Sequence, residues 1–225
     1  MHKLFLAFFI TSSFSCKDKT NVSRPVPSTL TIENSATFKP KQLSDTASWE
    51  FFLQHLPEKQ GPVVDYKGVP ISFQEKHYAL INYDVGTTDL QQCADALMRL
   101  RAEYLFARKR FEEIGFHFTD KQLYRFADYC NGKRPVPKGN SVQFISSSPH
   151  PKDLKSLRRY LDIVYTYAGT ISLAAELKTT TDFAIGTIVI KPGSPGHCFI
   201  ITDEATTSLG QKLFKLVEGY TPAQS

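Results

Sequence analysis

The amino-acid sequence predicts an α+β domain, and three changes of pattern along the chain support this fold class. Short strands come first, a helical middle part follows, and residues 184–218 alternate with the two-residue period of β-strands. Strands and helices that are grouped separately along a chain are typical of α+β folds. We therefore expect the last strands to form an antiparallel β-meander that packs on the longest predicted helix, residues 89–113.

The first elements of the domain are predicted to be short. Residues 44–55 begin with the capping signal Ser-Asp-Thr and continue with aromatic residues, which favours a helix. Residues 63–73 carry Lys67-Gly68 between two apolar stretches, a pattern typical of a β-hairpin. Residues 77–85 alternate between apolar and polar side chains and therefore predict a strand.

The strongest helical pattern spans residues 89–113. Asp89 is suited to cap this helix, because Gln92 follows it three residues later as in a capping box. The apolar positions that follow the helical period are Leu90, Cys93, Leu97, Leu100, Tyr104, Ala107 and Phe111.

The rest of the chain combines helices, a proline-rich loop and the meander. Helices are expected over residues 120–129 and 152–177, the latter weakened near Gly169-Thr170. The residues that favour a loop between these helices are Pro135, Pro137, Gly139 and Pro149. The strands of the meander are expected at residues 184–190, 197–202 and 213–218, with a tight loop at residues 191–196.

The first sixteen residues carry the pattern of an export signal. A basic start precedes the apolar stretch Leu4–Ile10, which is too short for a membrane span of about 20 residues. Small residues then lead to Cys16, as in bacterial lipoprotein signals, in which diacylglycerol is attached to the cysteine thiol and the signal is cut directly before that cysteine. We expect a signal peptide at residues 1–15, the lipidated cysteine and a flexible tether at residues 16–43, and a single domain at residues 44–225. The expected location is the outer membrane or periplasm; the alternative is an ordinary signal with a chance cysteine.

Charge and cysteine content exclude several classes of function. The net charge is +5, but Lys and Arg are scattered, and their clusters at residues 108–110 and 155–159 lie on predicted helices as solvated faces. We expect no nucleic-acid partner and contact with a membrane only through the lipid anchor. No cysteine or histidine pair has metal-ligand spacing, so we predict no metal site and no cofactor. Lipidation of Cys16 leaves three cysteines, an odd number that implies at least one free thiol.

Cys93 is the first candidate for chemistry, because it lies in the first turn of the strongest predicted helix. The partial positive charge and unpaired N–H groups of a helix N-terminus favour the thiolate, the nucleophilic form of cysteine. Gln91 and Gln92 beside it are candidate donors to an oxyanion. The alternative for Gln92 is a role as a cap of the helix. The alternative for Cys93 is a core cysteine, because it shares its helical stripe with Leu97 and Leu100.

His197 opens a predicted strand directly after a Gly/Pro loop, where functional side chains are often presented. A cysteine at a helix start followed by a histidine at a strand start is the chain order of papain-like hydrolases. If strands 197–202 and 213–218 form an antiparallel hairpin, Glu218 lies near His197 and can orient its ring. Asp203 is about 20 Å farther along the strand, out of reach, and is better suited to a turn. A structural role for His197 is the alternative.

Three stretches, Asp89–Tyr104, Tyr167–Leu173 and Gly193–His197, resemble the bacterial lipoprotein family called domain of unknown function 4846. The resemblance covers nearly the whole mature chain from about Ser44, and the family name states no activity. The chain ends at Ser225 directly after a predicted strand, which leaves a domain truncated at its C-terminus as one alternative.

A second resemblance concerns the fold. Cys93 at a helix start and Gly196-His197 at a strand start are similar to NlpC-type peptidases, which are papain-like cell-wall enzymes. This resemblance implies a papain-like fold with a helical insertion, and a cysteine hydrolase that cleaves amide or peptide bonds of a cell-envelope peptide or peptidoglycan-like substrate. The other hypothesis is a non-catalytic binding or scaffold lipoprotein with Cys93 in its core.

Overall fold

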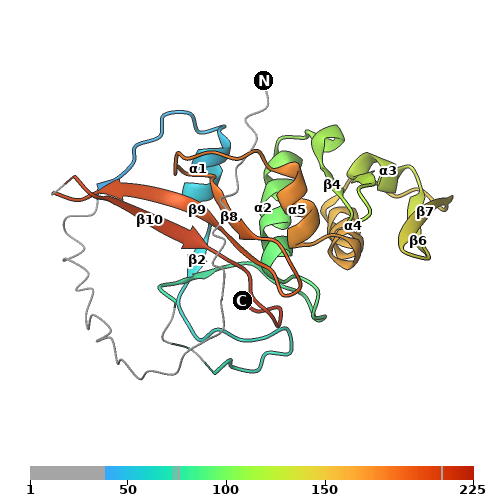
Figure 1. Ribbon diagram of the computed structural model, residues 1–225, viewed down its shortest axis with the longest axis horizontal. Coiled ribbons are helices and arrows are strands. Elements are labelled where there is room, and N and C mark those ends of the chain that lie inside the picture. The colour runs from blue at the N-terminus through green and yellow to red at the C-terminus, as the bar shows by residue number, and fades with distance from the viewer. Residues whose placement is uncertain (1–38, 73, 75–76, 209) are drawn as a thin grey trace, which may run out of the picture.

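The structure, a computed structural model, describes residues 39–72, 74, 77–208 and 210–225. Within these residues, five α-helices combine with small antiparallel sheets, which confirms the α+β fold class. Helix α2 (Cys93–Ala107) lies in the middle of the molecule, between the main sheet on one side and most of the remaining helices and the hairpins of residues 115–146 on the other (Figure 1). The signal predicted for residues 1–15 lies outside the described residues, and so does the part up to residue 38 of the tether predicted for residues 16–43.

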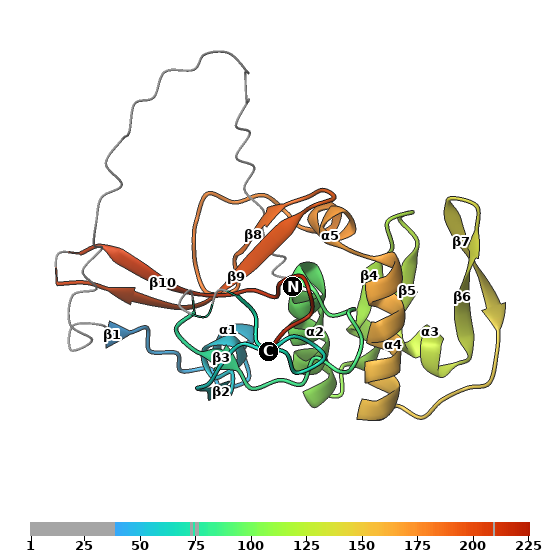
Figure 2. The same ribbon diagram turned by 90° about the horizontal axis from the view of Figure 1, so that it is seen from below.

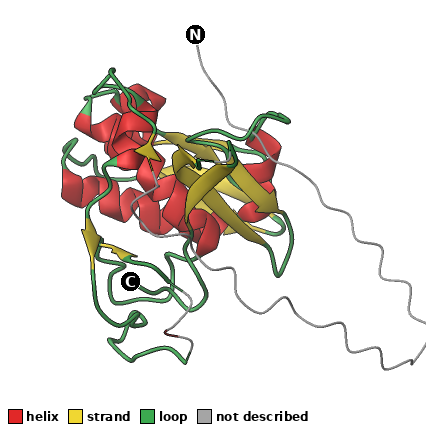
Figure 3. Ribbon diagram, turned by 90° about the vertical axis from the view of Figure 1, so that its left-hand side faces the viewer, coloured by secondary structure: helices red, strands yellow, loops and turns green. Residues whose placement is uncertain are grey.

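The main sheet is built around one long strand. Its strands are β8 (Ile188–Lys191), β9 (His197–Thr206), β10 (Lys212–Val217) and the short β1 (Lys39–Pro40). β9 pairs antiparallel with β8 and β10 in the predicted meander, and β1 pairs with its end. The strands lie side by side with helices around them (Figure 3). The sheet packs on α2 through β9, as the change of period predicted (Figure 2).

Helix α2 is shorter at both ends than the predicted helix 89–113. It begins after Gln92, whose backbone N–H donates to the carboxylate of Asp95 at 3.0 Å. Asp89 does not cap the helix; its carboxylate accepts from the side chain of Gln92 and from the backbone N–H of Ala223. The helix ends because Lys109 adopts a left-handed conformation, with φ of 56°. A short 3₁₀ turn, η3 (Phe111–Glu113), follows.

The first elements are also shorter than predicted. Helix α1 (Trp49–Gln54) begins after Ser48, whose hydroxyl accepts the N–H of Phe51 at 3.0 Å. Strand β3 (Leu80–Ile81) is all that forms of the predicted strand 77–85, and it pairs with β2 (Glu58–Lys59).

The predicted hairpin 63–73 is present as a short one with a single bridge between Val64 and Pro70. The backbone N–H of Asp65 donates to the carbonyl of Val69 across it at 2.8 Å. The backbone of Val64 also exchanges hydrogen bonds with Ser225, at 3.1 and 3.0 Å. The segment therefore holds the C-terminal residues beside α2, and Ala223 is fully buried there.

The predicted helix 120–129 is correct only in its second half. Its first half belongs to a hairpin of β4 (Gly115–His117) and β5 (Leu123–Arg125), and helix α3 (Phe126–Cys130) follows. Asp120 forms the turn of this hairpin, because its carboxylate accepts the N–H groups of Gln122 at 3.0 Å and Val142 at 2.8 Å. A side chain that binds local backbone in this way favours a turn over a helix.

The loop predicted from the prolines contains a second hairpin. Strand β6 (Lys133–Lys138) pairs with β7 (Ser141–Ser146), with Pro135 opposite Phe144 and Pro137 opposite Val142. The two prolines stand two residues apart, so their nitrogens face the same side of the strand. An edge strand accepts proline on its unpaired side, which is why the loop prediction was wrong here.

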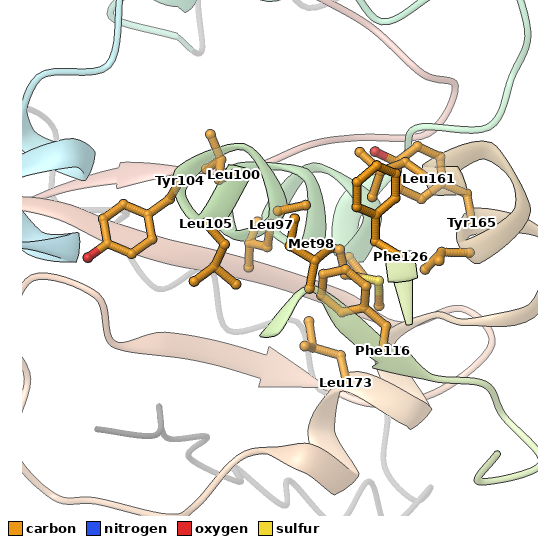
Figure 4. Packing of buried hydrophobic residues seen from close by; sticks show 14 of the residues in the cluster. Leu97, Met98, Leu100, Tyr104, Leu105, Phe116, Phe126, Leu161, Tyr165 and Leu173 are labelled. Atoms are coloured by element: carbon orange, nitrogen blue, oxygen red, sulfur yellow. The ribbon is translucent and has the colours of Figure 1, made fainter. Parts of the chain in front are cut away.

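The predicted helix 152–177 is divided where the sequence weakens it. Helix α4 (Leu154–Tyr167) ends before an extended Gly169, and α5 (Thr170–Glu176) begins after it. The core lies between α2, α4 and the hairpin β4–β5 (Figure 4). Figure 4 shows Leu97, Met98 and Leu105 of α2 in one cluster with Phe116, Phe126, Leu161, Tyr165 and Leu173.

Candidate active site

Cys93 is the first residue of α2 and is partly exposed, whereas Leu97, Leu100 and Tyr104 further along its stripe are buried. Its thiol donates a hydrogen bond to the backbone carbonyl of Gly196, with 3.8 Å between sulfur and oxygen. Gly196 directly precedes His197 in the chain. The structure therefore brings Cys93 next to the start of β9, although 103 residues separate it from Gly196.

His197 and Glu218 are in direct contact. Nε2 of His197 lies 2.5 Å from a carboxylate oxygen of Glu218, and both side chains are partly exposed. β10 pairs Val217 with Ile200, so Glu218 follows the last residue of the strand and reaches His197 diagonally rather than from directly opposite. The ring of Tyr220 meets the His197 ring edge-on, with 5.6 Å between their centres. Glu218 and Tyr220 thus both contact the imidazole and restrict its orientation.

Two glycines allow these strand ends to approach the helices closely. A Cβ on Gly196 would lie 2.0 Å from the hydroxyl of Thr170, the first residue of α5. A Cβ on Gly219 would lie 2.5 Å from the carbonyl oxygen of Gln92, directly before Cys93. Any side chain at either position would force the strand ends away from the helix starts.

The thiol and the imidazole are neighbours but are not joined. Among the residues that the structure describes, no hydrogen bond links Cys93 to His197, and none engages Nδ1 of His197. Nε2 is occupied by Glu218, so Nδ1 is the ring atom that remains for exchange of a proton with a nucleophile. Apo sites often have catalytic hydrogen bonds that form only when substrate binds.

Both glutamines beside Cys93 already bind protein groups. Gln91 is buried, and its side-chain oxygen accepts from the guanidinium of Arg99 at 2.8 Å. The side chain of Gln92 donates to Asp89 and accepts from Thr221. Their role as oxyanion donors stays a prediction, and their contacts tie together the segments around the start of α2. The backbone N–H groups of the first turn are the donors that helix geometry leaves unpaired.

The surroundings of Cys93 include a buried acid that the pattern analysis did not single out. Asp95 lies in the same helical turn and is only 7% exposed. Burial raises the pKa of its carboxyl to about 7. Burial also raises the pKa of the thiol of Cys198, the residue of β9 that follows His197. The spacing of Asp95 three residues after Gln92, as in a capping box, is the signal that could have identified it.

Asp203 lies away from the site, as its distance along the strand predicted, but it does not form a turn. It is a residue of β9, where its carboxylate accepts from Gln54 at 2.7 Å. A groove of about 440 Å³ lies at this far end of the sheet, and its lining residues include Lys41, Asp182, Phe183, Glu204, Lys212 and Phe214. None of the residues predicted for catalysis lines this groove.

A family model described as "Domain of unknown function (4846)" matches residues 30–225. The chain belongs to this family. The predicted membership in domain of unknown function 4846 is thereby confirmed. No curated protein and no solved structure matches the chain.

Two further features bear on the class of site. In residues 39–72, 74, 77–208 and 210–225, no group of three His, Cys, Asp or Glu side chains is arranged to hold a metal ion. Cys93, Cys130 and Cys198 are all free thiols. Within the same part of the chain, none of the helices is both long enough and apolar enough to span a membrane.

Proposed function

We propose that this protein is a cysteine hydrolase with Cys93 as nucleophile, His197 as general base and Glu218 as the group that orients His197. The observation that carries the proposal is one arrangement: the Cys93 thiol on the carbonyl of Gly196, directly before a histidine whose Nε2 is held by Glu218 at 2.5 Å. A nucleophile, a base within reach and a third group that orients the base form the pattern of triad catalysis.

The chemistry proceeds by acyl transfer in two steps. Nδ1 of His197 takes the thiol proton, the sulfur of Cys93 bonds to the carbonyl carbon of an amide, and N–H groups of the first turn of α2 stabilise the oxyanion. The C–N bond then breaks, and the imidazolium gives its proton to the leaving amine. Water, deprotonated by His197, attacks the thioester and releases the carboxylic acid, which restores the thiol.

The second candidate is a non-catalytic envelope module, and one observation favours it. The thiol donates to the carbonyl of Gly196 rather than to the imidazole of His197. A cysteine that serves only to fasten the start of α2 to the loop before β9 would make this same contact. The partial exposure of Cys93 and the engagement of Nε2 by Glu218 support the hydrolase over this module, because a fastening role requires neither.

The substrate class that we propose is a peptide of the cell envelope, including the stem peptides of peptidoglycan. The test is incubation of the full chain with stem peptides and with ordinary linear peptides, followed by mass spectrometry of the products. The proposal expects cleavage at an amide bond, with a gain of one water across the two fragments. Intact peptides of both kinds after prolonged incubation at several pH values would contradict it.

For the location, we propose an exported protein anchored through a lipid on Cys16. The motivation is the short apolar stretch followed by small residues and Cys16. Cells fed radiolabelled palmitate should incorporate label into the protein, and Cys16→Ser should lose it. Two acyl signals give stable membrane anchoring, so the variant should also leave the membrane fraction. Label that persists in Cys16→Ser would refute the anchor, whereas Cys130→Ser should keep its label.

A further inference from the structure

Asp95 occupies an unusual position for an acid. It lies two residues after Cys93 in the first turn of α2, and it is 7% exposed. One carboxylate oxygen accepts the backbone N–H of Gln92 at 3.0 Å. The other oxygen, Oδ1, is buried and has no hydrogen-bond partner among the described residues. A fully ionised carboxylate would leave that oxygen buried and uncompensated, which is costly.

Charged groups do not relieve this cost. Two neighbours on other elements lie within electrostatic reach of Asp95: Tyr165 of α4 and Cys198 of β9. Neither carries a positive charge. The charged groups that act on Tyr165 are Arg99 of α2 with Arg158 and Asp162 of α4, and Glu218 is the acid besides Asp95 that acts on Cys198. Among these groups, only the two arginines are positive, and they are not among the causes that shift the pKa of Asp95.

Two opposite effects act on the ionisation of Asp95, and their sizes decide the outcome. The hydrogen bond from the backbone N–H of Gln92 and the partial positive charge of the helix N-terminus favour the charged form. Burial favours the neutral form and moves the pKa of Asp95 from 3.8 to about 7. Burial therefore prevails, and the carboxyl is neutral below neutral pH.

We propose that Asp95 is a positioning residue for Cys93. The carboxyl of Asp95 holds the N-cap of α2, and in its neutral form it places no negative charge next to the nucleophile. The inference rests on the proposed role of Cys93 as a nucleophile. A thiolate gains from the helix N-terminus, and an ionised Asp95 in the same turn opposes this gain. Asp95 thus accepts the backbone N–H of Gln92 at all pH values, but it opposes ionisation of the Cys93 thiol only when its own carboxyl is charged.

The test is the rate of Cys93 alkylation by iodoacetamide across pH, read from the Cys93 peptide of the full chain by mass spectrometry. Asp95→Asn keeps the shape and an acceptor for Gln92 but has no charge at any pH. The alkylation rate of Asp95→Asn divided by that of the natural protein should be near one at about pH 5. It should rise to about three- to tenfold at about pH 8.5, because a unit charge at this distance shifts the pKa of a thiol by about one pH unit. Asp203, at the far end of β9, is also a buried aspartate, and Asp203→Asn should give a flat ratio.

A ratio that stays constant across pH in folded Asp95→Asn would overturn the proposal, because a purely structural role changes the rate without such a pH dependence. If Asp95→Asn does not fold, the ¹³C shift of the Asp95 carboxyl in the natural protein decides instead: a midpoint near 7 is expected, and a midpoint below about 5 overturns the proposal.

Alkylation needs no hydrolysis. A dependence of this kind without peptide cleavage would sustain the role of Asp95 toward the thiol while refuting the hydrolase.

Discussion

Replacing Cys93 by alanine is expected to reduce amide hydrolysis by at least about a thousandfold. Cys93 supplies the only atom that bonds to the substrate in the proposed reaction, so its loss leaves no covalent route. The side chain is partly exposed at the first residue of α2, and its removal deletes one weak hydrogen bond to Gly196. The free energy of unfolding should therefore change little, and the loss of activity can be read without a loss of fold.

The matched control is Cys130→Ala. Cys130 is also a free thiol, but it is buried in α3 and donates to the carbonyl of Pro151 at 3.8 Å. Its replacement should leave the rate of peptide cleavage unchanged within about twofold, because it touches no residue of the site. Equal cleavage by natural protein and Cys93→Ala would show that another group performs the chemistry.

The second large effect is on stability. Leu161→Ala is expected to reduce the free energy of unfolding by about 3–5 kcal/mol, measured by urea denaturation. Leu161 lies in the core with no exposed surface, among the side chains that join α4 to α2 and to Phe126 (Figure 4). The replacement removes methyl groups that fill this core and leaves a cavity behind. Domains of this size are stable by about 5–15 kcal/mol, so the variant loses a large fraction of the total.

Leu154→Ala provides the same substitution on the same helix. Leu154 is the first residue of α4 and is 62% exposed. Its replacement should change the free energy of unfolding by no more than about 0.5 kcal/mol, because little apolar surface leaves the protein interior. Similar losses for the two variants would contradict this account, because the cost of Leu161→Ala would then not arise from its burial.

The parts of the fold that followed from the sequence have long, regular patterns. The alternation of residues 184–218 predicted the meander, and the apolar repeat of residues 89–113 predicted its supporting helix. The weak point at Gly169 also appeared as a break between α4 and α5. These patterns arise because burial on one face imposes a period of 2 or 3.6 residues on any long element.

The errors occurred where a contact distant in sequence, or a single backbone conformation, outweighed the local pattern. Asp120 looked like the start of a helix, but its carboxylate binds the N–H of Val142 and forms a turn. The left-handed conformation of Lys109 ends α2 within an apolar repeat that continues. Pro135 and Pro137 were interpreted as loop residues because the sequence does not reveal which edge of a strand is unpaired.

In the candidate site, too, some contacts could be predicted from the sequence and others could not. The contact between His197 and Glu218 could be derived from the expected hairpin, since both residues lie near paired strand ends. The register was less certain, because β10 contains an irregularity between Lys215 and Leu216 and Glu218 reaches His197 diagonally. The engagement of Gln91 by Arg99 could not be predicted, because it depends on how the buried guanidinium is oriented.

The central claim is that His197 acts on the thiol of Cys93, and one measurement tests it most directly: the rate of Cys93 alkylation as a function of pH in the natural protein and in His197→Ala. If His197 takes the thiol proton, the natural protein should react at about pH 6–7 at least about tenfold faster than His197→Ala, and the two rates should converge above about pH 9. Superimposable profiles across the whole range, with both proteins folded, would contradict the pairing and with it the hydrolase.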